Sequence, residues 1–176
     1  MSTTRRAATK AEARALASTV RLRILRLCRD QALTNKEIAH RLGANPATTL
    51  HHVRTLVETG FLAAEPSRPG PRGSTEIPYR ATGKSWPLDT REAGVPGSNA
   101  AIFEAFLQEI KPVDVEESWL GRVALRLTDE EHAEFQARLL ELFDEFRARN
   151  STGRPYSLFV ALHRDTFRDG WSSADH

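Results

Sequence analysis

The densest run of side chains that could take part in chemistry lies in residues 45–60, Asn-Pro-Ala-Thr-Thr-Leu-His-His-Val-Arg-Thr-Leu-Val-Glu-Thr-Gly. Asn45 can cap a helix, Pro46 suits its first position because the N–H there needs no helical partner, and Gly60 can end it. The sequence therefore predicts a helix over residues 46–59. Its buried face is expected to carry the apolar residues at helical spacing, Leu50, Val53, Leu56 and Val57, with Thr49 at the edge.

The opposite face of this predicted helix carries hydrogen-bonding side chains. It comprises Thr48, His51, His52 and Thr55, flanked by Ala47 and Arg54. Hydroxyls and imidazoles can bond to base edges and phosphates, and a threonine methyl can contact a thymine methyl. Imidazoles near phosphates also gain charge as the pH falls through about 6.5. Together with Asn45 these residues form the candidate DNA-reading set; the alternative is an ordinary solvated helix face.

A second helix must hold this one in place. Thr34 and Glu37 have the spacing of a capping box, and the helix they open is expected to run to Leu42 and stop at Gly43. The two helices are then joined by about three residues including a glycine, which is the spacing of a helix-turn-helix. Before them, Thr9 with Glu12 predicts a short helix to about residue 17, and Ser18 a second helix to about residue 31.

The chain changes its period after Gly60. Residues 61–65 predict a strand, residues 66–74 a turn-rich basic loop, and residues 76–82 a returning strand, with Pro78 suggesting an edge. A hairpin directly behind a helix-turn-helix is a wing. Arg68 and Arg72 in its loop can reach phosphates or a minor groove; the alternative is a basic loop with no partner. Arg5, Arg6 and Lys10 could add phosphate contacts as an N-terminal tail.

Charge is distributed unevenly along the chain. The 176 residues hold 25 Lys and Arg against 23 Asp and Glu, but residues 1–95 hold 16 of these cations and only 8 of the carboxylates. The first half therefore carries +8 and the second half −6. This imbalance indicates that the first half meets a polyanion, although a solvated basic face without a partner would give the same count.

The second half is expected to dimerise or to sense a ligand. A helix over 98–111, a strand over 119–127, a helix over 128–150 and a strand over 156–163 are predicted after a linker at 83–97. The helix over 98–111 carries a wide apolar stripe: Ile102, Phe103, Phe106, Leu107 and Ile110. We expect this stripe to lie at a homodimer interface; the alternative is burial against residues 119–163 of the same chain.

Several other functions are excluded by what the sequence lacks. It has no glycine-rich phosphate loop, nucleophile elbow or His-Glu-x-x-His motif, so an enzyme is not expected. Its single cysteine, Cys28, lies in an apolar helical stripe, and His51 and His52 point about 100° apart, so neither a metal nor another cofactor is expected. No membrane span or secretory signal is present, which predicts a cytoplasmic protein.

Three segments resemble the ArsR-type (arsenic-repressor) family of bacterial winged-helix regulators. They are residues 22–27 (Leu-Arg-Ile-Leu-Arg-Leu), residues 34–39 (Thr-Asn-Lys-Glu-Ile-Ala) and residues 52–62, from His52 to Leu62. The resemblance covers roughly residues 10–82. It implies a repressor that acts as a homodimer on an inverted repeat, with two recognition helices in successive major grooves about 34–36 Å apart. The thiolate pair of the family's metal sensors is absent here.

The sequence thus predicts an α+β protein, mainly α, in three parts. Residues 1–82 form a winged helix-turn-helix, residues 83–97 a linker, and residues 98–176 a helix-strand-helix-strand unit for dimerisation or sensing. The expected function is a sequence-specific DNA-binding transcription regulator whose partners are double-stranded DNA, a second copy and an unidentified small-molecule effector. Two alternatives stay open: a winged helix that binds protein, and a sensor that releases DNA on binding an apolar ligand.

Overall fold

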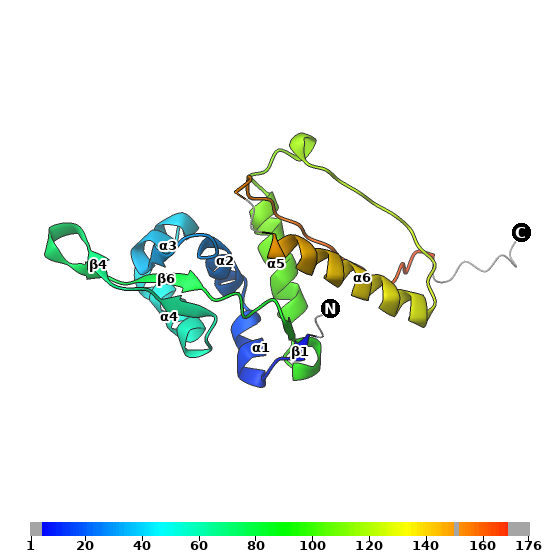
Figure 1. Ribbon diagram of the computed structural model, residues 1–176, viewed down its shortest axis with the longest axis horizontal. Helices are drawn as coiled ribbons and strands as arrows, with labels where there is room; N and C mark the ends of the chain where they lie inside the picture. Colours follow the sequence, from blue (N-terminus) through cyan, green and yellow to red (C-terminus); the bar gives the residue numbers. More distant parts are fainter. Residues whose placement is uncertain (1–4, 150–151, 169–176) are drawn as a thin grey trace, which may run out of the picture. The chain divides into compact units, whose positions relative to one another are not determined.

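The computed structural model describes residues 5–149 and 152–168. The chain is α+β, mainly α, and forms two compact units, one ending at Val113 and the other beginning at Asp114 (Figure 1). No helix in the described ranges is long and apolar enough to cross a membrane.

The N-terminal unit is a winged helix-turn-helix preceded by two helices and followed by a third. Its helices and strands are, in order, β1 (Arg6–Ala7), α1 (Lys10–Leu16), α2 (Thr19–Leu27), β2 (Leu33–Thr34), α3 (Asn35–Leu42), α4 (Pro46–Glu58), β3 (Leu62–Ala64), β4 (Arg68–Pro69), η1 (Pro71–Gly73), β5 (Thr75–Glu76), β6 (Pro78–Ala81), β7 (Leu88–Asp89), η2 (Arg91–Ala93) and α5 (Ser98–Ile110).

The helices begin where the sequence predicts them, because the predicted caps form. Thr9 and Thr34 each accept a backbone N–H and have their own N–H bound by the glutamate three residues later, which closes two capping boxes. Asn45 caps α4 with Pro46 at the first helical position. Gly43 ends α3 in the left-handed region (φ 62°), where a side chain would be strained.

The wing grows out of a three-stranded sheet of order β2-β6-β3. The strand β6 pairs antiparallel with both neighbours, so Pro78 lies on the central strand and the predicted edge position is wrong. Pro78 is the first residue of β6, where the missing N–H interrupts little of the ladder, and its carbonyl accepts the N–H of Glu65 (2.9 Å). Beyond this sheet the short strands β4 and β5 pair to form the wing tip.

The segment expected as a linker, residues 83–97, belongs to the N-terminal unit. It contains η2 and β7, and β7 pairs in parallel with β1. A pairing of two residues per strand leaves no periodic signal in the sequence, which is why a linker was predicted there. The helix α5 also belongs to this unit, since it packs on α1 and α2.

One apolar core holds this unit together. Its largest fully buried side chains come from α2, α3, α4 and the start of the wing: Ile24, Cys28, Ile38, Thr49, Val53, Leu56, Phe61 and Leu62. At roughly 1.5–3 kcal/mol for burying each large aliphatic or aromatic side chain, this cluster is the main stabilising contribution to the unit.

The C-terminal unit contains η3 (Val115–Glu117) and the long helix α6 (Asp129–Ala148), whose start is fixed by a capping box of Thr128 and Glu131. The strands predicted over 119–127 and 156–163 do not form, since neither segment has strand pairing in the structure. Alternation of apolar residues indicates an extended segment, but a strand also needs a hydrogen-bonded neighbour. Within the described part of this unit no side chain is fully buried.

A buried carboxylate ties the N-terminus to the chain after the wing. Glu12 has a side chain only 8% exposed and accepts both Nη atoms of Arg6 (2.9 and 3.1 Å), the N–H of Thr9 (2.8 Å) and Nζ of Lys84 (2.8 Å). The Arg6 hydrogen bonds, with those of Lys84 and Thr9, hold the pKa of Glu12 well below its usual value despite burial.

We expect Glu12→Gln to lower the free energy of unfolding by about 1–3 kcal/mol at pH 7, because cations and an N–H lose an ionised acceptor. The contribution of a carboxylate whose pKa is lowered by folding is present at neutral pH and is lost as the pH falls below about 4.3 toward the folded-state value. Urea unfolding at pH 7 and pH 3 should therefore show a difference between the two proteins that shrinks in acid. The exposed Glu92→Gln serves as the control, and an equal loss in both variants would contradict the role of Glu12.

Candidate nucleic-acid interface

The helix α4 is held by one face and exposes the other. Its buried residues are Thr49, Val53 and Leu56, and it packs against α2, α3 and β3. Thr49 is not at the edge of this face but fully buried, and its hydroxyl donates to the carbonyl of Asn45 (3.0 Å). Val57 is predicted to be buried but is 37% exposed. It follows Leu56 by one residue, about 100° around the helix, so its side chain points away from the preceding helices.

The exposed face of α4 begins at its N-terminus. Side chains of the predicted DNA-reading set that are exposed here are Asn45, Ala47, Thr48, His51 and Arg54. Asn45 uses Oδ1 to cap the N–H of Ala47 (2.8 Å), so its amide N–H₂ is still able to donate outward. This is the arrangement of a recognition helix, whose N-terminal residues contact bases in the major groove.

Two members of the predicted set are only half-exposed. The hydroxyl of Thr55 donates to the carbonyl of His51 (3.1 Å), so it is directed along the helix. Nδ1 of His52 is buried and has no hydrogen-bond partner among the described residues. Burial lowers the pKa of His52, and the positive charges of Arg21 and His51 lower it further. The two adjacent histidines therefore differ in their surroundings: His51 is exposed, whereas His52 is half-buried.

The two predicted wing arginines lie in different elements of the wing, Arg68 in β4 and Arg72 in η1. The guanidinium of Arg68 donates to Oε1 of Glu37 on α3 (2.7 Å) and is 46% exposed. Arg72 lies in η1 at the wing tip, and its side chain is outside the described part of the structure. The wing tip extends away from the helices on the side where β4 is marked in Figure 1.

Sequence reasoning missed two residues at the start of α3, Asn35 and Lys36. Nδ2 of Asn35 donates to the carbonyl of Pro46 (2.9 Å), which places the beginning of α3 beside the beginning of α4. Lys36 is 66% exposed and pairs with Glu76 of the wing (3.1 Å). The position of Lys36 in the first turn of a helix-turn-helix was a usable signal, whereas nothing in the sequence indicated the contact with Glu76.

The basic N-terminal residues are not a free tail. Arg6 is bound to Glu12, and the guanidinium of Arg5 lies 4.7 Å from the ring centroid of Trp86. Lys10 is exposed at the start of α1, and the side chain of Arg6 is 53% exposed although it is paired with Glu12.

Cys28 is fully buried in the apolar core, as its position in the helical stripe predicted. Burial raises the pKa of its thiol to about 11, so the thiolate that would bind a soft metal is disfavoured at neutral pH. Among the described residues no three His, Cys, Asp or Glu side chains are grouped as metal ligands would be.

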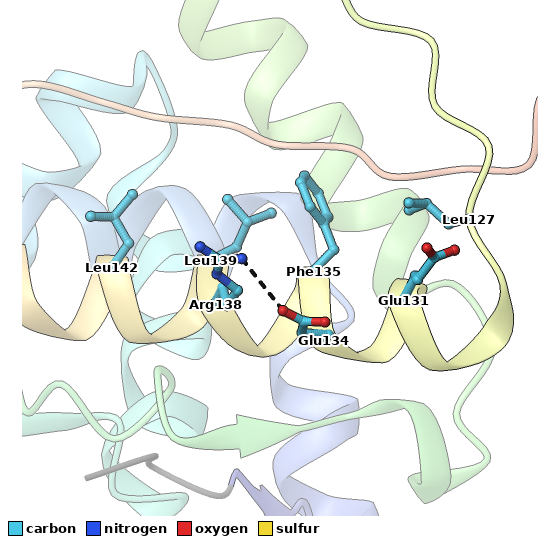
Figure 2. Close-up of a pocket in the computed structure, with 7 residues that line it drawn as sticks. All are labelled: Leu127, Glu131, Glu134, Phe135, Arg138, Leu139 and Leu142. Carbon is cyan, nitrogen blue, oxygen red and sulfur yellow. Dashed lines mark hydrogen bonds and ion pairs between the residues drawn. The ribbon is translucent and has the colours of Figure 1, made fainter.

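The C-terminal unit contributes a shallow groove of about 600 Å³ on one side of α6. Figure 2 shows apolar side chains projecting from α6 toward it and an ion pair of Arg138 with Glu134 (3.4 Å) at its margin. The apolar lining consists of Leu127, Phe135, Leu139 and Leu142.

Comparison with known proteins identifies the motif. Residues 16–64 match the family model of a helix-turn-helix domain. Helix-turn-helix domains are DNA-binding modules, and the matched segment includes the helices α3 and α4 joined by a short turn. It contains α2, α3, α4 and β3, so the match covers the core of the interface described above.

Several solved structures are weakly similar to this chain. A mutant of ZitR from Lactococcus lactis is 22% identical over 72% of this chain and 73% of its own, with a TM-score of 0.35. The adhesin competence repressor AdcR from Streptococcus pyogenes is 16% identical over 74% and 81%, with a TM-score of 0.31. The regulator SlyA is 16% identical over 72% and 73%, also with a TM-score of 0.31. No curated protein matches the chain.

The half-buried His52 should not contribute to any pH dependence of DNA binding. Because folding lowers its pKa, its imidazole stays neutral at pH values where an ordinary imidazole becomes charged. We expect His52→Gln to leave the change in DNA affinity between pH 8 and pH 6.5 as it is in the wild type, measured by fluorescence anisotropy. A His52→Gln protein whose affinity no longer responds to pH would contradict this.

Zinc, cadmium or arsenite at ten times the protein concentration should alter DNA affinity less than twofold, because the Cys28 thiol is buried and protonated. The same anisotropy titration, with and without metal, measures this, and Cys28→Ser is the matched control. Stoichiometric metal uptake with loss of DNA binding would overturn the expectation.

Proposed function

We propose that the protein is a sequence-specific transcription regulator of the ArsR type, a repressor that binds an inverted repeat as a homodimer. The observation that carries the proposal is the face of α4 formed by Thr48, His51 and Arg54, which is exposed while Val53 and Leu56 on the other side are fully buried. A helix held by one face and polar on the other can enter a major groove without disturbing its own domain.

The charge of the surroundings supports the same function. Residues 1–95 carry a net +8, and the wing beside α4 holds the cations that a phosphate backbone attracts. Phosphate contacts fix the position of a protein on the duplex, and base contacts from the recognition helix determine the sequence. A winged helix that docks on an acidic protein would use the same charge but would not select among DNA sequences.

The homodimer is supported by the way α5 packs. Its small residues Ala101 and Ala105 are buried, on a helix that packs on α1 and α2, and Glu109 pairs with Arg26 (3.0 Å). Two of the large residues on the predicted stripe, Ile102 and Leu107, are 43% and 42% exposed. A winged helix needs two copies to reach two successive major grooves, and this face offers an apolar surface for the second copy.

The rest of the predicted stripe is less uniform than its sequence spacing suggested. Phe103 is 50% exposed, and Phe106 and Ile110 are half-buried. The helix α5 therefore packs on its own unit through alanines and leaves Ile102, Phe103 and Leu107 exposed. This arrangement supports the proposed dimerisation through Ile102 and Leu107.

An effector that controls DNA release is a second proposal, favoured by the groove on α6. Four apolar side chains line it, including Phe135 and Leu139, and charged groups of Glu131 and Arg138 lie at its margin. Small-molecule sites are mostly apolar with a few polar groups that fix orientation. The test is a screen of apolar carboxylates and amines for compounds that release DNA from the wild type. Such a compound should fail to release DNA from the variant Leu139→Glu, whose groove carries a charge.

The recognition helix should determine which DNA is selected. Bound duplexes selected from random DNA should contain an inverted repeat, and Thr48→Ala or His51→Ala should each cost roughly 1–3 kcal/mol at one base position of each half-site. The exposed His132→Ala of the C-terminal unit should leave the selected sequence unchanged. If the wild type and the double variant Thr48→Ala plus His51→Ala select the same DNA sequence, α4 is excluded as the reading element.

Replacing both Ile102 and Leu107 with Glu should give a folded monomer, because two carboxylates cannot be buried in an apolar interface without partners. Light scattering gives the mass and circular dichroism the fold. The control adds the same charge to the wing, as Ser67→Glu plus Thr75→Glu, and should stay dimeric. A wild type that is monomeric at micromolar concentration would refute the dimer.

A further inference from the structure

Four charged side chains connect the first turn of α3 with the base of the wing tip. On α3, Lys36 and Glu37 are consecutive; in the wing, Arg68 and Glu76 lie directly opposite each other in the β4–β5 pairing. Arg68 donates to Glu37 (2.7 Å), and Lys36 donates to Glu76 (3.1 Å). Each wing charge is therefore matched by an opposite charge on α3. We call these four residues the α3–wing charge cluster.

The two carboxylates of this cluster are held in place by the local backbone. The second oxygen of Glu37 accepts the N–H of Thr34 (2.7 Å) in the capping box of α3. Glu76 has a side chain only 16% exposed, and it passes over Gly70. A Cβ at Gly70 would lie 2.6 Å from Cγ of Glu76, closer than side-chain atoms approach one another. Gly70 thus leaves the space that lets Glu76 reach Lys36.

The cluster lies at the DNA-reading end of the unit. Asn35, next to Lys36, donates to the carbonyl of Pro46 at the start of α4 (2.9 Å). Residues at the N-terminus of a recognition helix approach the bases, so phosphates pass close to the beginning of α3. The cations Lys36 and Arg68 are 66% and 46% exposed, which leaves them within reach of those phosphates.

The magnitudes decide what such a cluster can do. An exposed ion pair changes an equilibrium constant by only about 1.4-fold to 5-fold, too little to hold the fold together. One phosphate contact has an effect of comparable size. It adds about 0.9 to the slope of log affinity against log salt concentration, which changes the affinity about 3.5-fold between 50 and 200 mM salt. A carboxylate beside a cation can therefore cancel one phosphate contact, and non-specific DNA binding depends almost entirely on such contacts.

We propose that Glu76 is a specificity-determining residue, which pairs with Lys36 so that the cation is withheld from arbitrary DNA while the wing stays docked on α3. The inference rests on the proposed DNA-binding function. In the complex with the preferred sequence the wing keeps its docked position and the contacts of α4 supply the affinity. On arbitrary DNA those base contacts are absent, and a freed Lys36 would add a contact that carries no sequence information.

The test compares Glu76→Gln with wild type on the preferred duplex and on a scrambled one, over a salt series. The variant should bind the scrambled duplex about threefold to tenfold more tightly at 50 mM salt, with a log–log slope steeper by about 0.9 per subunit. Affinity for the preferred duplex should change less than twofold, so the ratio of the affinity for the preferred duplex to that for the scrambled duplex falls. Gly70→Ala should act in the same direction, because its methyl group would lie 2.6 Å from Cγ of Glu76 and 2.6 Å from Oγ of Ser74, and Glu76 would have to move.

Two controls identify the cation and the cause. Glu92→Gln makes the same change in net charge on η2, away from the wing, and should leave the slope unchanged. Lys36→Gln combined with Glu76→Gln should return the slope to the wild-type value. Circular dichroism and urea unfolding verify that each variant is folded.

The outcomes separate the two proposals. If wild type binds both duplexes without salt dependence or preference, the proposed function fails. If wild type shows both but Glu76→Gln behaves like Glu92→Gln, the function stands and the role of Glu76 is refuted. A steep slope that persists in the double variant also refutes it, because Lys36 is then not the released cation.

Discussion

Burial of Val53 and Leu56 against the preceding helices fixes the rotation of α4 about its own axis, and the proposed DNA-reading surface depends on that rotation. Turning the helix by one residue, about 100°, would expose a side chain whose burial stabilises the unit by roughly 1.5–3 kcal/mol. The same rotation decides which polar residues are outside. Because Thr49 and Val53 are buried on one side of the helix, Thr48 and His51 lie on the side that faces solvent.

Charged contacts then attach the outer parts of the unit to this core. Glu12 joins β1, α1 and the chain after the wing, while Glu37 and Glu76 join the wing to α3. The contacts of Glu12 are largely shielded from solvent and contribute to the free energy of unfolding, because a buried charged group left without its partner is costly. The other two are more exposed, and their energies are small enough to compete with phosphates. Similar side chains thus serve different purposes according to their burial.

Local features of the fold could be predicted from the sequence, because each depends on residues close together in the chain. The caps of Thr9, Thr34, Asn45 and Thr128 formed as their spacing indicated, and the apolar stripe placed Cys28 in the core. The helix-turn-helix followed from such signals, and the family match over residues 16–64 confirms it.

Features that depend on distant residues could not be predicted. The pairing of β1 with β7 joins residues 6–7 to 88–89, and the contact of Lys36 with Glu76 spans forty positions. The depth of His52 and Thr55 depends on what covers one side of α4, which a helical wheel does not show. Residues 119–127 have the alternation of a strand but no paired neighbour, so periodicity alone gave the wrong element there.

The central position of β6 affects what the chain would tolerate at the exposed wing tip. Its two partners, β2 and β3, precede the tip, and β6 follows it, while β1 and β7 pair across the same point. A break in the backbone between Gly70 and Gly73 would therefore leave two pieces that still share a sheet, a parallel pair and the apolar core. Such a unit is suited to reassembly from separately produced fragments, and the tip is the place where inserted sequence would disturb it least.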